Sequence, residues 1–277
     1  MDEIPVETDG TRARGELARF VGLACAITWT LAAPMAFAWA TDRAPHPLAV
    51  PCAGMSAFGP LIAMLIVRAR SGTLRAWRGE WRTLPATRLW GLAALAMFTP
   101  MALHVVALAL GALFGAHVPA WLHPPRTPEA TAALVVFPLG EELGWRGFAH
   151  DAAARAFGAV RGALVVGVAW GLWHLAYAVT PTAHGFDVVT FATTMAELPP
   201  YAVLFAWAFE RSRRSMLVPM AFHVGAHLDH AEAATDLGRW FIGCHLVVVT
   251  ALAVLAARSL REMKTDHIPR GIFSRST

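Results

Sequence analysis

Long apolar segments are the feature that most restricts how this sequence can fold. Hydrophobic residues make up 56% of the 277 positions and charged residues only 15%, which is typical of proteins that cross a membrane several times. A membrane-spanning α-helix needs about 20 consecutive, mostly apolar residues. The pattern predicts an all-α, polytopic membrane helical bundle of about eight transmembrane helices, at residues 17–40, 48–67, 89–115, 131–150, 162–179, 188–209, 215–228 and 239–257.

The segments outside these runs indicate how the chain is divided. Residues 1–16 are polar and carry both signs of charge, so we expect a mobile N-terminal tail. Residues 17–258 form the expected helical domain, with its motif-bearing core at residues 131–229, and residues 259–277 form a basic C-terminal tail. Three cysteines without a CxxC pair are interpreted as small core residues.

The basic residues indicate the orientation in the membrane. Most of the 23 lysines and arginines fall in the two tails and in alternate connections, so the positive-inside rule places both termini in the cytoplasm. Because these residues occur in short clusters between apolar runs, they predict contact with a lipid bilayer and no binding of nucleic acid. The Ala- and Arg-rich composition fits a GC-rich bacterial genome, and we expect a multi-pass protein of the bacterial inner membrane.

Two local features refine the first half of the chain. Gly54, Gly59 and Pro60 lie inside the second apolar run and predict close packing or a kink. The arginine-rich residues 68–88, with two tryptophans, predict an amphipathic segment on an anionic membrane surface.

Three charged residues interrupt the apolar run LVVFPLGEELGWRGFA at residues 134–149. A charge at the centre of a membrane helix costs about 2.5 to 3.5 kcal/mol on insertion scales, so it requires a partner, water or a function. Arg146 lies four residues after Glu142, which places both on one helical face as a pair. Glu141 is turned about 100° around the helix. In a partly dry cavity this carboxyl group could work as a general base.

Three histidines lie in later apolar runs. His174 belongs to WGLWHLAY, while His223 and His227 belong to FHVGAH and share one helical face because they are four residues apart. At about 1.5 Å per residue from the expected cytoplasmic ends, Glu141, His174 and His223 lie at similar depths. We therefore predict one intramembrane site made by three helices. No comparable group of residues accompanies His104, His245 or Glu197. We interpret these three as packing, interface or substrate-lining residues.

These residues resemble the motifs of a known family. The segment EELGWR at residues 141–146 matches EExxxR, Trp170 to His174 resembles FxxxH, and His223 to His227 resembles HxxxN. The three motifs are those of the CAAX prenyl protease and bacteriocin-processing family of intramembrane endopeptidases, which includes the type II CAAX enzymes. Trp170 replaces the usual phenylalanine, which we interpret as a packing change. His227 replaces the usual asparagine, and histidine can titrate and bind metal where asparagine cannot.

The resemblance implies hydrolysis of peptide bonds in hydrophobic or lipidated peptide or protein substrates. In one mechanism Glu141 removes a proton from water that His174 helps to hold, while His223 and His227 donate hydrogen bonds to the oxyanion. Glu142 and Arg146 then orient the base. The implied catalytic residues are Glu141, Glu142, Arg146, His174, His223 and His227.

A second mechanism uses a zinc-like divalent metal. The candidate ligands are Glu141, His174, His223 and His227, and two histidines four residues apart suit zinc. We favour the metal-free mechanism, because the family pattern has asparagine at the last position and asparagine is a poor zinc ligand.

Two other classes of function remain open from the sequence. A transporter could use the carboxylate and histidines as a relay for protons or metal ions. A non-catalytic membrane scaffold could retain the same residues for packing between helices.

Overall fold

The computed structural model describes residues 9–75, 84–115, 127–180, 185–229 and 238–263. Within these ranges the protein is an all-α bundle, as predicted, with one short antiparallel pair, β1 (Val179–Thr180) and β2 (Gly185–Phe186). The helices are α1 (Asp9–Ala40), α2 (Ala49–Ser56), α3 (Gly59–Arg70), α4 (Ala86–Leu113), α5 (Pro128–Gly144), α6 (His150–Phe157), α7 (Ala159–Trp173), α8 (Val188–Arg211), α9 (Leu217–Asp229) and α10 (Gly238–Glu262). A π-helical turn, η2 (Trp145–Ala149), joins α5 to α6, and a 3₁₀ turn, η3 (His174–Tyr177), follows α7.

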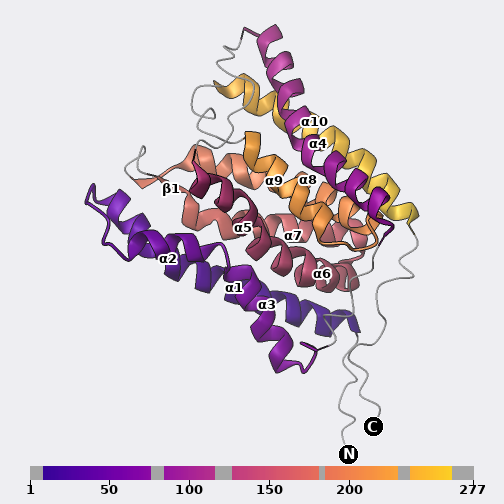
Figure 1. The fold of residues 1–277 in the computed structure, drawn as a ribbon, viewed down its shortest axis with the longest axis horizontal. Coiled ribbons are helices and arrows are strands. Elements are labelled where there is room, and N and C mark those ends of the chain that lie inside the picture. Colours follow the sequence, from indigo (N-terminus) through magenta and orange to yellow (C-terminus); the bar gives the residue numbers. More distant parts are fainter. Residues whose placement is uncertain (1–8, 76–83, 116–126, 181–184, 230–237, 264–277) are drawn as a thin grey trace, which may run out of the picture.

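The helices form a central group covered on two sides (Figure 1). Helices α1, α2 and α3 lie on one side, and α1 contacts α2, α3 and α6. Helices α4 and α10 pack together on the opposite side, where α4 contacts α9 and α10 contacts α8. Helices α5 to α9 occupy the space between them. The helices with the predicted site residues therefore lie between these two outer groups.

Fewer helices satisfy the criteria for a membrane span than the sequence predicts. Among the described residues, five segments are long and apolar enough: α1, α4, α7 with η3, α8, and α10 from Trp240. A sixth is added if α2 and α3 form one bent span. Helix α5 is not among them, and the apolar part of α9, Leu217–Leu228, is shorter. The count of eight spans and the side of each terminus therefore stay predictions.

The kink predicted in the second apolar run is confirmed. Helices α2 and α3 are separated by a short break and bent by 60°. Gly59 begins α3 against α1, where an added Cβ would overlap the Thr28 hydroxyl group. The same hydroxyl donates a hydrogen bond of 2.8 Å to the Ser56 carbonyl oxygen at the end of α2. Close packing against α1 thus accompanies the bend.

The N-terminal segment differs from the expected tail. Helix α1 already begins at Asp9, and both Ala13 and Glu16 are buried. Glu16 forms ion pairs with Arg12 (3.3 Å) and with Arg155 of α6 (3.4 Å). The mixed charges that suggested a mobile tail are thus partners on the surface of a helix. A tail over residues 9–16 is not what the structure has, and residues 1–8 lie outside the described residues.

The expected surface segment and C-terminal tail also need correction. Arg68 is only 5% exposed, and its Nη2 donates to the Gly147 carbonyl oxygen at 3.0 Å. Its guanidinium group also lies 5.6 Å from the centre of the Phe148 ring, so it belongs to the interior and not to a membrane surface. Residues 76–83 lie outside the described residues. Helix α10 continues to Glu262, inside the segment expected to be a tail.

Close contact between α4 and α9 requires a glycine. A Cβ atom added to Gly225 would overlap the carbonyl oxygen of Met97 on α4. Gly225 lies between His223 and His227, so the contact also fixes the position of both imidazole rings relative to the bundle.

Replacing Gly225 with alanine is expected to lower the free energy of unfolding by about 1 to 3 kcal/mol, because the added methyl group pushes α9 away from α4. Unfolding of the purified protein in detergent, followed by circular dichroism, measures the change. The matched control is Gly243→Ala on α10, where an added Cβ meets nothing within 4 Å. Equal stability of the two variants would contradict the close contact.

Candidate functional site

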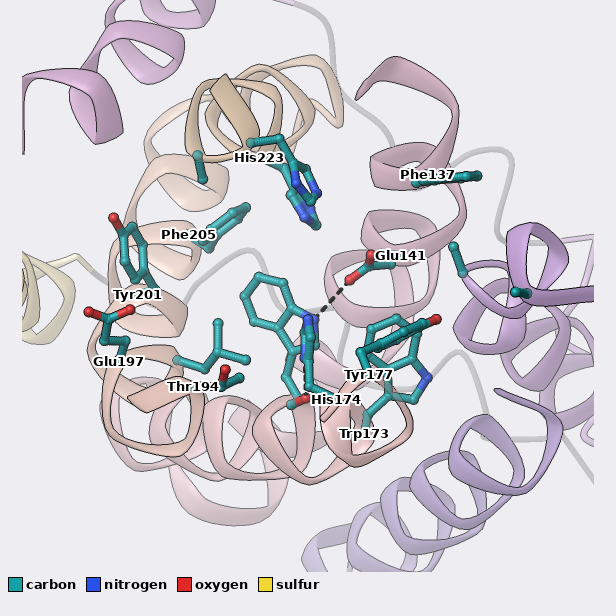
Figure 2. Close-up of a pocket in the computed structure, with 16 residues that line it drawn as sticks. Phe137, Glu141, Trp173, His174, Tyr177, Thr194, Glu197, Tyr201, Phe205 and His223 are labelled. Atoms are coloured by element: carbon teal, nitrogen blue, oxygen red, sulfur yellow. Dashed lines mark hydrogen bonds between the residues drawn. The ribbon is translucent and has the colours of Figure 1, made fainter. Parts of the chain in front are cut away.

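A cavity of about 430 Å³ lies among α2, α5, α7, η3, α8 and α9. Its wall includes Glu141 from α5, His174 from η3, and His223 and His227 from α9. Figure 2 shows the labelled side chains of Glu141, His174 and His223 around this space. The structure therefore brings together the residues that the sequence analysis placed at a similar depth on three helices.

The carboxyl group of Glu141 is held by one oxygen only. Trp170 Nε1 donates a hydrogen bond of 2.9 Å to Glu141 Oε2 (Figure 2). Among the described residues, nothing donates a hydrogen bond to Oε1. The indole group thus restricts the carboxyl group and leaves its second oxygen available to the cavity. Phenylalanine could not form this bond, so the interpretation of Trp170 as a packing change is wrong.

Glu142 faces away from the cavity and links two helices. Its side chain is fully buried, with Oε2 3.1 Å from Arg146 Nε. Oε1 forms a hydrogen bond of 2.8 Å with Nδ1 of His223 on α9. We expected this pair to orient Glu141, whereas its contacts orient His223. A carboxylate that bonds to one ring nitrogen of a histidine commonly fixes the orientation of the ring and leaves the other nitrogen for the site.

Arg146 is 2% exposed and is surrounded by aromatic rings. Its guanidinium carbon lies 3.9 Å from the centre of the Phe205 ring and 4.5 Å from that of Trp170. Nη1 and Nη2 have no hydrogen-bond partner among the described residues. The negative faces of the two rings therefore supply much of the environment that stabilises this buried charge.

The other two histidines adopt different environments. His174 begins η3, and its Nδ1 forms a hydrogen bond of 2.8 Å with the Trp170 carbonyl oxygen. His227 is partly exposed, and its ring stacks on that of His223 with a centre-to-centre distance of 4.8 Å and an angle of 10°. The two stacked imidazoles and His174 thus border the cavity from separate helices.

Two glycines and a π-helical turn shape the segment that carries the glutamates. Cβ atoms added at Gly140 and Gly144 would come within 2.9 Å of Ala57 and 2.5 Å of Pro60, respectively. These glycines let α5 lie directly against the break between α2 and α3. The π turn at Trp145–Ala149 follows at once, and such turns often occur at functional sites. The spacing of four residues between these glycines is the signal in the sequence that indicates such a close helix contact.

Three of the four predicted metal ligands lie close together. Glu141, His223 and His227 each offer one ligand atom, and these atoms lie within 4.8 Å of one another. His174 is not part of this group. The donor set of one carboxylate and two imidazoles is a common one for zinc.

A second group of ionisable residues joins α6 to the end of α8. His150 Nε2 lies 2.9 Å from Glu210 Oε1, and Arg214 forms ion pairs with both Glu210 and Asp151. Because Arg214 already supplies a positive charge between the two carboxylates, we interpret the cluster as structural.

Replacing Arg146 with alanine is expected to lower the free energy of unfolding by about 3 to 5 kcal/mol, because Glu142 is left buried without its counter-charge. Chemical unfolding in detergent measures this loss. Arg12→Ala is the matched control, since it breaks an i to i+4 pair whose arginine side chain is 44% exposed, and it should change the stability by less than about 1 kcal/mol. Similar losses of stability in both variants would show that the buried ion pair contributes no more to stability than the exposed one.

Comparison with known proteins agrees with the motifs. Residues 124–228 match the model of the Rce1-like family, described as type II CAAX prenyl endopeptidase. The chain is also 21% identical over 120 residues to CAAX prenyl protease 2 of Methanococcus maripaludis, an alignment that covers 42% of this chain and 44% of the relative. The match thus spans less than half of that relative's length. Over the segment that carries both glutamates and all three site histidines, the chain is thus similar to the Rce1-like type II CAAX prenyl endopeptidase family.

Proposed function

We propose that the protein is an intramembrane endopeptidase in which Glu141 activates water for attack on a peptide carbonyl group. The observation that carries the proposal is the carboxyl group of Glu141, of which Trp170 holds one oxygen. This group lines one cavity with His174 and His223. The family match over residues 124–228 supports peptide-bond hydrolysis as the reaction.

The reaction needs one proton acceptor and one group that stabilises negative charge. Glu141 takes a proton from water, and the resulting hydroxide attacks the carbonyl carbon. His223 and His227 donate hydrogen bonds to the oxyanion of the tetrahedral intermediate. Glu141 then gives its proton to the leaving nitrogen, the C–N bond breaks, and the carboxyl group returns to its starting state. His174 borders the same cavity and helps to hold the water.

A divalent metal is the alternative source of an activated water. Glu141, His223 and His227 would hold it, and the hydrogen bond between His223 and Glu142 would orient one ligand. The bound ion would lower the pKa of its water ligand. Metal analysis of the purified protein, with peptide cleavage measured before and after a chelator, separates this route from the metal-free one.

The wall of the cavity supports one class of substrate. Phe137, Leu198 and Phe205 contribute apolar surface beside the polar residues, which suits a hydrophobic or lipidated peptide. Such a substrate would reach the cavity from the bilayer, which in this proposal is the bacterial inner membrane.

Replacing Glu141 with glutamine is expected to lower kcat/KM for a hydrophobic peptide by at least about 100-fold, because a general base contributes on this scale. His174→Ala should also abolish most of the cleavage, with no loss of folding. Mass spectrometry of a peptide library measures the products. Glu129→Gln is the matched control, since Glu129 is an exposed residue in the first turn of the same helix.

Retained cleavage in the Glu141→Gln variant would refute the proposal. Flux of protons or metal ions in proteoliposomes, without cleavage of any peptide, would instead support a transporter. Normal biological function of the same variant would support a scaffold.

Trp170→Phe is expected to lower kcat by about 10- to 100-fold with little change in KM, because the carboxyl group loses its only hydrogen-bond donor among the described residues. Steady-state kinetics in detergent or proteoliposomes measures both constants. Trp145→Phe is the matched control, since the buried Nε1 of Trp145 has no hydrogen-bond partner among the described residues. A loss of the same size in both variants would assign Trp170 to packing alone.

A further inference from the structure

Helix α8 presents one continuous face to the cavity. Thr194, Glu197, Leu198, Tyr201 and Phe205 all line it, and their spacing of three and four residues places them on one side of the helix. Glu197 is the acidic residue on this face. A carboxyl group in an apolar wall requires a partner or a function.

Glu197 is held in place from behind by α10. Its Oε1 forms a hydrogen bond of 2.7 Å with Nδ1 of His245, and the other ring nitrogen of His245 lies 3.3 Å from the Tyr201 hydroxyl group. The side chains of Glu197 and His245 are 12% and 4% exposed. No described residue donates a hydrogen bond to Oε2 of Glu197. One oxygen is thus fixed to the protein, and the other remains able to accept a hydrogen bond from an occupant of the cavity.

The distance between Glu197 and the level of the glutamate pair can be estimated from the geometry of α8. Phe205 contacts both Arg146 and His223, so it marks the level of the proposed catalytic residues. Glu197 precedes Phe205 by eight residues, which corresponds to about 12 Å along α8. Figure 2 places Glu197 across the cavity from Glu141. An extended peptide covers about 12 Å with three to four residues, at about 3.3 Å each.

We propose that Glu197 binds a lysine or arginine side chain of the substrate, three to four residues from the cleaved bond. The inference rests on the proposed function and adds a specificity to it. A cationic side chain supplies the hydrogen-bond donors and the opposite charge that Oε2 can accept. Its aliphatic stem packs along Leu198 and Tyr201, as long basic side chains commonly do on apolar surfaces. An acidic substrate residue at this position would be repelled.

Binding to an inactive variant tests the specificity without relying on catalysis. In the Glu141→Gln background, fluorescent hydrophobic peptides carry either lysine or norleucine at each position in turn. We expect lysine to improve Kd by about 10- to 100-fold over norleucine at one or two adjacent positions, on the scale of a charge-assisted hydrogen bond. The advantage should disappear when Glu197→Gln is added. Cleavage of the same peptides by the wild type locates the bond relative to those positions.

Glu210→Gln is the matched control. Glu210 lies on the same helix and also contacts a histidine, His150, but it does not line the cavity. This variant should keep the preference for lysine. Three outcomes would overturn the inference. The preference for lysine could be lost in both variants, it could be absent at every position, or it could be unaffected by Glu197→Gln. If the preference for lysine depends on Glu197 but the wild type cleaves no peptide, the binding site stands and the proposed hydrolase function is refuted. If the wild type cleaves peptides without any preference for lysine, the hydrolase function stands and the binding site is refuted.

Discussion

The buried link from Arg146 through Glu142 to His223 is the interaction on which the site depends. It joins η2 to α5 by an ion pair of 3.1 Å and α5 to α9 by a hydrogen bond of 2.8 Å, in a region packed by aromatic and aliphatic side chains. Removing either partner would leave a buried charge without compensation, which is strongly unfavourable. The link therefore fixes both the rotation of α5 and the ring of His223. Glu141, the residue before Glu142, is turned toward the cavity as a consequence.

Two adjacent glutamates thus have different surroundings and different roles. Glu142 is fully buried, with Oε1 hydrogen-bonded to His223 and Oε2 in an ion pair with Arg146. Glu141 has one oxygen held by Trp170 and lines the cavity. The same division recurs at Glu197, where His245 holds one oxygen and the other stays available. At both Glu141 and Glu197, a protein donor holds one carboxyl oxygen and leaves the other able to accept a hydrogen bond.

Local patterns in the sequence predicted much of this arrangement. The end of the first apolar helix at residue 40 and the start of α8 at residue 188 are confirmed, and the pairing of Glu142 with Arg146 follows from helical spacing. Contacts between distant segments could not be predicted in this way. The bond from Trp170 to Glu141 joins residues 29 positions apart, and no periodicity specifies which side chain of α7 meets α5. The tail was mistaken for a mobile segment because the partner of its charges lies in α6.

The central claim is that α5, α7 and α9 surround one cavity that admits a peptide. Photo-crosslinking tests it most directly: a hydrophobic peptide with a photoreactive group near its centre is bound to the Glu141→Gln variant, irradiated, and mapped by mass spectrometry. The account predicts labelling of Phe137, Tyr177 and Ala226, which line the cavity from three different elements. Labelling confined to the outer faces of α4 and α10, with none on these residues, would contradict it.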